Sequence, residues 1–201
     1  TDAAIEARLL HRALVDAVGE SLNRITVDGD TSTNDCAIVL ASGARPARAI
    51  DREGPDFDAF RGALTDAGRQ LAHMLVRDGE GVTRTAEVRI EGARTAQDAD
   101  RIARTVAESP LVKTALHGGD PNWGRVLAAV GRAGVPIDIG RVSIWIGDVH
   151  VAEGGAAREY DEKTAAAAMQ EDPVRLRVQL GEGQASGWMW TSDFSHGYVD
   201  I

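Results

Sequence analysis

The stretch TRTAEVRIEGARTAQDADRIARTVAESP, residues 83–110, predicts the layering of the fold because its hydrophobic period changes once. Over residues 83–93, polar and charged side chains alternate with Ala86, Val88 and Ile90, the pattern of a half-exposed strand. Residues 95–109 have a helical pattern, which Pro110 ends because proline is poorly tolerated inside a helix. A strand followed at once by a helix predicts a sheet with helices packed on it.

The rest of the chain extends this pattern on both sides. Helices are expected over residues 3–25, 56–78 and 160–170, the second with Phe57, Phe60, Leu64, Leu71 and Met74 or Leu75 on one face. Strands are expected over residues 36–42, 111–118, 141–151, 174–181 and 185–194, and a helix or strand over 126–134. The order predicts an α/β (α+β) layered sandwich: residues 1–110 form the layered core and 111–201 a smaller C-terminal α+β region.

The composition excludes several classes of protein. Apolar residues make up 43% and charged residues 26% of the 201, as in ordinary soluble proteins, and the net charge of −9 argues against a nucleic-acid surface. No apolar run approaches the roughly 20 residues of a membrane span. Cys36 is the single cysteine and the five histidines lack zinc-site spacing, so neither an internal disulfide nor a metal site is expected. A cytoplasmic protein is therefore predicted.

A polar stretch, DGDTSTNDC (residues 28–36), precedes the apolar run at residues 36–42. Its hydroxyl and carboxylate groups have the chemistry to line a site. Asx and Ser/Thr turns use the same residues to satisfy the backbone, so composition leaves both readings open.

A glycine-rich stretch, RDGEGVTR (residues 77–84), follows the second long helix. Gly79 and Gly81 permit a positive φ and a close approach to a ligand. Glu80 between them is suited to hold a substrate ammonium group by a charge-assisted hydrogen bond. The alternative is a helix-capping glycine beside a solvated glutamate.

The longest distinctive block is SPLVKTALHGGDPNWGRVLAAVG, residues 109–131. Its HGG sequence suggests an anion loop but lacks the spacing of a P-loop, and no partners at suitable spacing make His117 part of a Ser-His-Asp triad. The DPNWGR segment is either a binding turn or a loop anchored by Trp123, with Asp120 paired to Arg125.

Four stretches together carry a family resemblance: DGDTSTND, DGEGVTR, SPLVKTALHGGDPNWGR and TSDFSHGYVDI, the last at residues 191–201. Nearly the whole chain resembles the β-chain of the ornithine acetyltransferase (glutamate N-acetyltransferase) family of arginine biosynthesis. The resemblance implies a layered fold like that of N-terminal nucleophile hydrolases, with different connectivity. It also favours a role in the fold or an interface for DPNWGR.

The resemblance further implies a chemistry. Family members cut their own precursor at an Ala-Thr bond, and the new N-terminal Thr carries an acetyl group from N-acetylornithine to glutamate. Bifunctional members also accept acetyl-CoA as donor. An α-chain from the same precursor supplies a Thr-Gly oxyanion pair, two α and two β chains assemble, and no cofactor or metal is needed.

The family's site residues can be matched to positions of this sequence one at a time. Glu80 matches the substrate-binding glutamate of the DGEGVT motif, whereas Thr33, Asn34 and Asp35 are near-site candidates without a matched role. In the family, the catalytic Thr precedes the TDA sequence by several residues, so the nucleophile is expected before residue 1. Thr1, activated by its own amine, is the alternative nucleophile.

Two other functions fit the same residues. An N-terminal nucleophile amidase or aminopeptidase would pass its acyl group to water, and a non-catalytic homologue would keep only the fold. The acceptor that takes the acyl group separates the first from a transferase.

Overall fold

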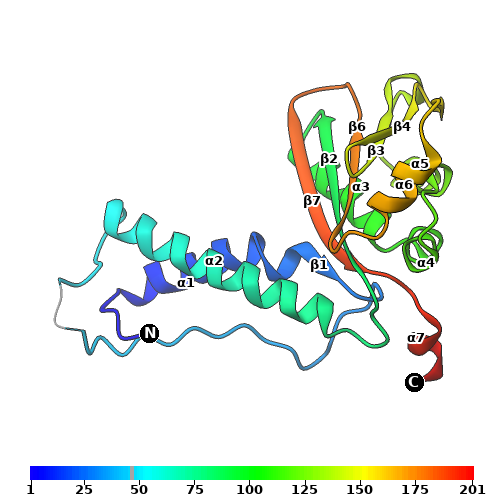
Figure 1. The fold of residues 1–201 in the computed structure, drawn as a ribbon. Coiled ribbons are helices and arrows are strands. Elements are labelled where there is room, and N and C mark those ends of the chain that lie inside the picture. The colour runs from blue at the N-terminus through cyan, green and yellow to red at the C-terminus, as the bar shows by residue number, and fades with distance from the viewer. Residues whose placement is uncertain (46–47) are drawn as a thin grey trace. The chain divides into compact units, whose positions relative to one another are not determined.

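The computed structural model describes residues 1–45 and 48–201, which form two compact units (Figure 1). The helical unit comprises Thr1–Ile25 and Thr31–Met74, and the sheet unit comprises Thr26–Asp30 and Leu75–Ile201. The expected domains, 1–110 and 111–201, divide the chain elsewhere and stay a prediction.

The helical unit contains α1 (Ala7–Gly19), a 3-10 turn η1 (Leu22–Arg24) and most of α2 (Pro55–Arg77). Leu9, Ala13 and Phe57 are buried between the helices. Phe60 and Leu64 pack against them, as the helical pattern predicts. The far end of the same face lies in solvent: Leu71 is 57% and Met74 63% exposed.

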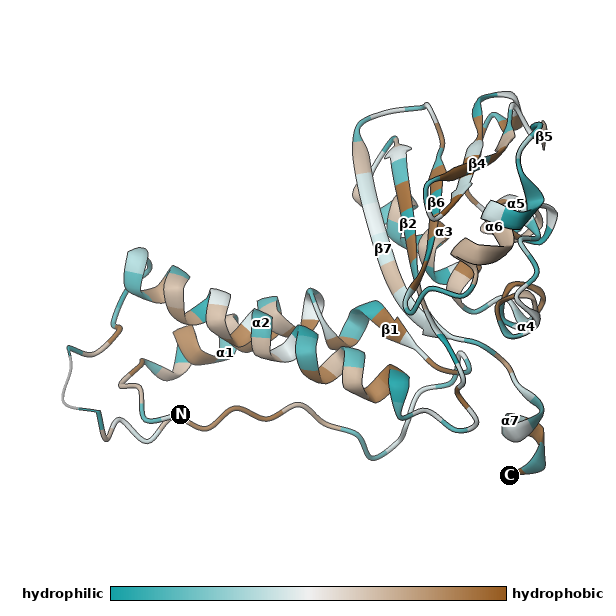
Figure 2. Ribbon diagram, in the orientation of Figure 1, coloured by the Kyte–Doolittle hydropathy of each residue, from teal (hydrophilic) through white to brown (hydrophobic). Residues whose placement is uncertain are grey.

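The run at residues 36–42 is also a departure from the prediction of a buried strand. It is extended but belongs to no strand of the described residues. Ile38 and Leu40 are exposed, because no element formed by residues 1–45 or 48–201 covers them. Figure 2 shows this hydrophobic stretch adjoining the N-terminus.

The sheet unit is built on a seven-stranded sheet in the order β1-β7-β2-β6-β3-β4-β5. Strand β2 is parallel to β6 and antiparallel to β7, and β3 runs antiparallel to both β6 and β4. The strands are β1 (Ile25–Thr26), β2 (Thr85–Ala93), β3 (Ser143–Ile146), β4 (Val149–Glu153), β5 (Ala156–Ala157), β6 (Val174–Gln179) and β7 (Ala185–Ser192).

Helices cover one face of this sheet, as the opening stretch predicts. Val88 and Ile90 of β2 are fully buried beneath α3 (Ala96–Ala107), whereas Glu87, Arg89 and Glu91 alternate onto the other face. Burying this alternate set of apolar side chains is the main source of stability for such a layer. The layered α/β prediction is confirmed.

Two segments differ from their predicted class. Residues 111–118, expected as a strand, lie in the helix α4 (Pro110–Gly118), with Pro110 in its first turn. The helix buries Val112 and Leu116 on one face. Residues 141–151 form the hairpin β3–β4 instead of one strand. The remaining helices are α5 (Trp123–Gly131), the 3-10 turn η2 (Ile139–Arg141), α6 (Glu162–Ala168) and α7 (His196–Asp200).

Candidate functional site

Glu80 lies exposed in the loop between α2 and β2 of the sheet unit. Gly81 beside it has a φ of +64°, and a Cβ there would stand 2.3 Å from the Tyr198 backbone nitrogen. A Cβ on Gly79 would stand 2.9 Å from Val27 Cγ1. Both glycines therefore permit close packing, and the backbone that presents Glu80 is held between two other segments.

The C-terminal segment provides one of these contacts. The Ser195 hydroxyl donates a hydrogen bond to the Gly81 carbonyl, directly before α7. Tyr198 in α7 donates its hydroxyl proton to Asp28 Oδ2 at 3.2 Å. The loop at residues 26–30, the Glu80 loop and α7 thus meet at one place.

This place is rich in negative charge. The pKa of Tyr198 is raised, first by the charge of Asp28, then by burial and its hydrogen bond to Asp28, and further by the charges of Glu80 and Asp30. Three carboxylates therefore act on one phenol. Such a surface favours a cationic ligand over an anionic one.

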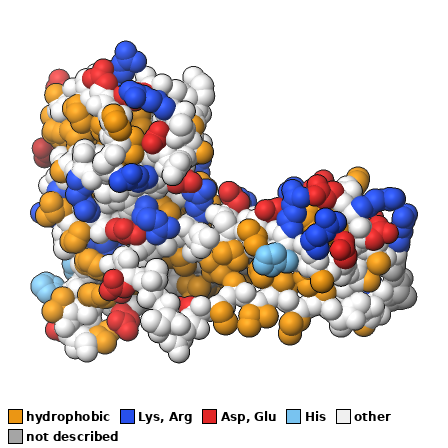
Figure 3. All heavy atoms as spheres, turned by 180° about the vertical axis from the view of Figure 1, so that it is seen from behind, with side chains coloured by type: hydrophobic (Ala, Val, Ile, Leu, Met, Phe, Trp, Pro, Cys, Tyr) orange, Lys and Arg blue, Asp and Glu red, His pale blue; other side chains and the backbone are white. Residues whose placement is uncertain are grey.

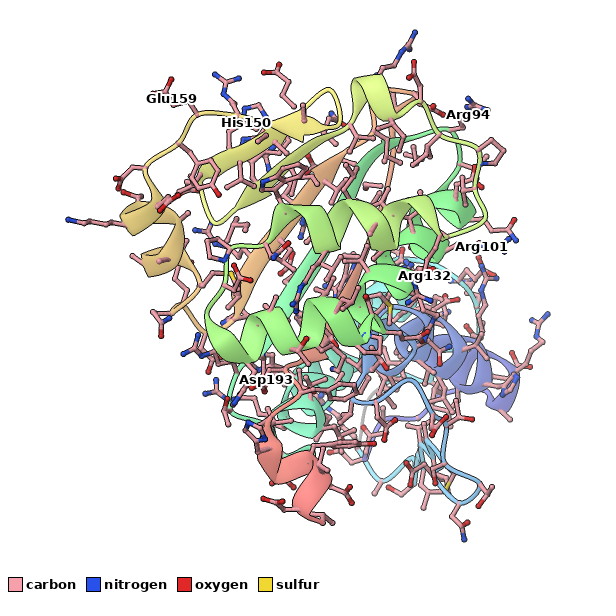
Figure 4. The ribbon with its side chains drawn as sticks, turned by 90° about the vertical axis from the view of Figure 1, so that its right-hand side faces the viewer. Arg94, Arg101, Arg132, His150, Glu159 and Asp193 are labelled. Atoms are coloured by element: carbon pink, nitrogen blue, oxygen red, sulfur yellow. The ribbon has the colours of Figure 1, made fainter. Side chains whose placement is uncertain are left out.

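Asp193 fastens the base of the Glu80 loop. Its carboxylate, with no exposed side-chain surface, accepts hydrogen bonds from the Thr83 amide at 2.9 Å, the Thr83 hydroxyl at 2.5 Å and the Arg84 amide at 3.1 Å. His117 Nδ1 lies 2.9 Å from Asp193 Oδ2. Burial alone would raise the pKa of Asp193, but these hydrogen bonds outweigh it and lower the pKa. Figure 4 marks Asp193 just before α7.

Thr83, His117 and Asp193 bring together the three groups of a catalytic triad, which their spacing in the sequence did not suggest. The arrangement is not that of a triad. The Thr83 hydroxyl donates to Asp193, and the same His117 nitrogen, Nδ1, faces both partners at 3.3 and 2.9 Å. A triad needs the base to accept from the nucleophile through one nitrogen and to donate to the acid through the other. These contacts hold the loop in place.

Lys113 of α4 is completely buried beneath this cluster. Its ammonium donates to the Ser192 carbonyl, to Thr191 Oγ1 at 3.0 Å and to Ser192 Oγ at 3.2 Å, and lies 4.5 Å from the centre of the Phe194 ring. Burial lowers its pKa to about 8, opposed by the charges of Asp193 and Asp28. Lys113 thereby fixes the end of β7 just before Asp193.

The polar stretch at residues 28–36 is divided between the units. Asp28 and Asp30 lie in the sheet unit with Glu80, and Thr33, Asn34 and Asp35 lie in the helical unit. The Asn34 and Asp35 amides donate to Ser32 Oγ at 3.1 and 3.2 Å, and Thr33 donates to the Asn34 side chain. These are the local turn contacts that the composition allowed, and the near-site role of the three residues stays a prediction.

Thr1 forms hydrogen bonds with backbone groups. Its amine donates to the Leu40 carbonyl at 2.9 Å, and its Oγ1 accepts from the Ala3 amide at 3.2 Å. The hydroxyl and amine are thus both engaged, each with a backbone group.

The DPNWGR segment builds the start of α5. The Asn122 side chain caps the helix by accepting from the Arg125 amide at 3.1 Å, and it donates to Asp120 at 3.0 Å. Arg125 donates to the Leu111 carbonyl at 2.9 Å and to Thr114 at 3.0 Å. The expected pairing of Asp120 with Arg125 is wrong, because each has a nearer partner. Gly119, in the HGG sequence, ends α4 in the left-handed conformation.

The sequence singles out Glu80 as a candidate site residue, but it does not indicate Lys113, His117 and Asp193 as the support of its loop. Asp193 is 76 positions from His117 in the chain. No local pattern marks such a contact, although both residues lie in stretches singled out as distinctive.

Comparisons with known proteins agree with one another. The family model described as the ArgJ family matches residues 1–201. The "Arginine biosynthesis bifunctional protein ArgJ" of Methylococcus capsulatus is 46% identical over 203 residues, and that of Pseudomonas fluorescens is 44% identical over 204. Each match covers all of this chain, which spans about half the length of these curated relatives.

The fold agrees with a solved structure as well. A crystal structure of arginine biosynthesis bifunctional protein ArgJ from Bacillus halodurans matches with a TM-score of 0.95 and 39% identity, over 100% of this chain and 94% of that one. Among the described residues, no helix combines the length and apolar character needed to cross a membrane. With a family match along its whole length, the chain belongs to the ArgJ family.

Proposed function

We propose that this chain is the β-chain of a glutamate N-acetyltransferase that moves an acetyl group from N-acetylornithine to glutamate in arginine biosynthesis. The observation that carries the proposal is the Glu80 loop. Its glycines, the C-terminal segment and Asp193 fix it so that a carboxylate projects beside Asp28 and Asp30.

The charge of this site fits the proposed substrate. N-acetylornithine carries one ammonium group, on its side chain, because its α-amine is acetylated, and a carboxylate holds an ammonium group by a charge-assisted hydrogen bond. Glu80 would bind this ammonium group. The close packing of Gly81 against the C-terminal segment would hold the loop, and with it the Glu80 carboxylate, in one position.

The proposed chemistry is a two-step acyl transfer. A threonine hydroxyl, several residues before Thr1 in the precursor, attacks the acetyl carbonyl of N-acetylornithine with its own α-amine as base. The C–N bond breaks, the ornithine amine takes the proton, and an acetyl ester remains on the threonine. The glutamate amine then attacks the ester and regenerates the hydroxyl. An α-chain from the same precursor completes the site, in a cytoplasmic assembly of two α and two β chains.

Intact mass of the full-length, self-processed protein tests the proposal. With N-acetylornithine alone, the β-chain should gain one acetyl group, and glutamate should remove it as N-acetylglutamate. Release of acetate to water at the same rate with or without glutamate would indicate an amidase. A chain that never gains mass would indicate a non-catalytic homologue. Repeating the assay with acetyl-CoA identifies a bifunctional member.

The substitution Glu80→Gln tests the binding role. Losing a charge-assisted hydrogen bond costs about 1.5–3 kcal/mol, so kcat/KM for N-acetylornithine should fall about 10- to 150-fold. Glu159→Gln is the matched control, because Glu159 is also an exposed glutamate of the sheet unit and should leave the kinetics unchanged. Unchanged kinetics in both variants would contradict the role of Glu80.

A further inference from the structure

Lys113 is a buried cation beneath the acidic end of the sheet unit. Figure 3 shows Asp and Glu side chains on the surface at the end of the unit that carries α7, whereas Lys113 has no exposed surface. The three N–H groups of its ammonium have three acceptors: the Ser192 carbonyl, Thr191 Oγ1 and Ser192 Oγ. These neutral oxygens offset only part of the cost of burying a charge, and burial lowers the pKa of Lys113 to about 8. Groups held under such a cost are concentrated at functional sites.

A first link runs from Lys113 through Ser192 to the loop at residues 26–30. Ser192 Oγ accepts from the Lys113 ammonium at 3.2 Å and donates to the Val27 carbonyl at 3.4 Å. Val27 directly precedes Asp28 in the chain. Lys113 therefore helps to fix where this loop meets the end of β7, and with it the position of the Asp28 carboxylate.

A second link runs through Phe194 to α7. The Phe194 amide donates to the Lys113 carbonyl at 3.2 Å, and the Lys113 ammonium lies 4.5 Å from the centre of the Phe194 ring. The Tyr198 ring stacks on Phe194 with the ring centres 4.9 Å apart, and the Tyr198 hydroxyl donates to Asp28. Lys113 thus holds both the backbone and the ring against which Tyr198 packs.

A third link reaches the Glu80 loop through Asp193. Lys113 contacts the residues on both sides of Asp193, Ser192 before it and Phe194 after it. The Asp193 carboxylate in turn accepts hydrogen bonds from two amides at the base of the Glu80 loop. The three segments that meet at the acidic site are therefore all joined to the same buried lysine.

We propose that Lys113 is a positioning residue for ammonium recognition: by holding the Asp28 and Glu80 loops to one another, it sets the affinity of the site for the side-chain ammonium group of the substrate. Because it is completely buried, Lys113 acts through these loops and does not touch the substrate. The inference rests on the proposed function, since that function supplies the ammonium-bearing donor, N-acetylornithine.

A donor without the ammonium group separates this role from a general support of the fold. N-acetylnorvaline has the acetyl group and backbone of N-acetylornithine, with a hydrogen atom in place of the side-chain ammonium group. A displaced carboxylate weakens the binding of N-acetylornithine alone, because only that donor makes a charge-assisted hydrogen bond to it. A general loss of structure weakens the use of both donors.

Lys113→Met in the full-length, self-processed protein tests the role, because methionine keeps an apolar stem but has no N–H donors. The KM for N-acetylornithine should rise about 10- to 100-fold with kcat unchanged, and kcat/KM for N-acetylnorvaline should stay the same. Lys163→Met is the matched control, since Lys163 is the other lysine of the chain and is exposed in α6. Equal losses for both donors, or no loss for N-acetylornithine, overturn the positioning role.

Ser192→Ala tests the first link with a smaller disturbance of the core. It removes the hydroxyl between the Lys113 ammonium and the Val27 carbonyl and leaves the lysine in place. The KM for N-acetylornithine should again rise while kcat/KM for N-acetylnorvaline stays the same, but by a smaller factor than in Lys113→Met. An unchanged KM for N-acetylornithine overturns the link from Lys113 to Asp28.

Titration calorimetry with ornithine gives a measurement that does not depend on acetyl transfer. The Kd for ornithine should rise about 10- to 100-fold in Lys113→Met and stay unchanged in Lys163→Met. Weaker ornithine binding by Lys113→Met, in a protein that transfers no acetyl group, would refute the proposed function alone. Acetyl transfer by the unsubstituted protein, with equal ornithine affinities in the two variants, would refute the role of Lys113 alone.

Discussion

At Gly81, the absence of one methyl group keeps Glu80 in place. A Cβ there would lie 2.3 Å from the Tyr198 nitrogen and 2.6 Å from the Gly197 carbonyl carbon, and the φ of +64° is strained for other residues. The backbone atoms it would meet cannot rotate away as a side chain can. The site therefore depends on a backbone contact as much as on its carboxylates.

Gly81→Ala should lower the free energy of unfolding by more than about 1 kcal/mol and raise the KM for N-acetylornithine. Gly62→Ala is the control, because Gly62 is exposed in α2 with nothing within 4 Å of an added Cβ. It should stabilise the protein by about 0.5–1 kcal/mol. Urea unfolding measures both free energies. If the two substitutions changed the free energy of unfolding in the same direction, the close contact of Gly81 with Tyr198 and Gly197 would be contradicted.

Lys113 makes stability depend on pH. Its pKa is about 8 in the folded protein and about 10.4 in an unfolded chain. Between these values the unfolded chain binds more protons, so the free energy of unfolding should rise with pH. The rise should reach about 2 kcal/mol from pH 8 to 9.5, measured by urea unfolding. Lys113→Met should abolish it, and parallel pH profiles in the two proteins would show that Lys113 is not its source.

At the scale of elements, local pattern predicted β2 and α3 because their periodicity and their environment agree. It failed at residues 110–118, because Pro110 ends the preceding helical pattern and also suits the first turn of the next helix. Lys113 contributed to the error, since a buried lysine hides the helical stripe formed by Val112 and Leu116. Residues 36–41 failed differently, because an apolar run predicts burial whereas Ile38 and Leu40 are exposed.

The candidate site shows the same limit. Glu80 was predicted because two glycines flank it in the sequence and because its motif resembles a family motif. The support from Asp193 and Lys113 arises only when β7 and α4 pack together, and it joins residues that are far apart in the chain. Periodicity carries no information about such pairs.

The N-cap of α5 tests the structural role of DPNWGR. Asn122→Ala removes the acceptor for the Arg125 amide and should lower the free energy of unfolding by about 1 kcal/mol. Asn122→Asp keeps an acceptor at this position and should retain most of the free energy of unfolding. Thermal or urea unfolding measures both, and kcat should be unchanged in either variant. A fall in kcat with unchanged stability would instead assign the segment to the active site.

At the scale of the whole molecule, the two units differ in how completely they bury their apolar residues. The sheet unit has a continuous core along β2, β6 and α3, with Val88, Ile90 and Ile102 fully buried. The buried cluster of the helical unit is Leu9, Ala13 and Phe57. Its exposed apolar residues include Leu40 and Leu71.

This asymmetry predicts two unfolding transitions for the 201-residue chain by itself. All four tryptophans lie in the sheet unit. Tryptophan fluorescence therefore reports only the unfolding of the sheet unit, whereas far-UV circular dichroism reports the helices of both units. In urea, the helical signal should begin to fall before the fluorescence changes, because a small core gives little stability. In the full-length protein the early transition should move to higher urea. Coincident transitions in the isolated chain would show instead that the two units unfold cooperatively, without help from the rest of the precursor.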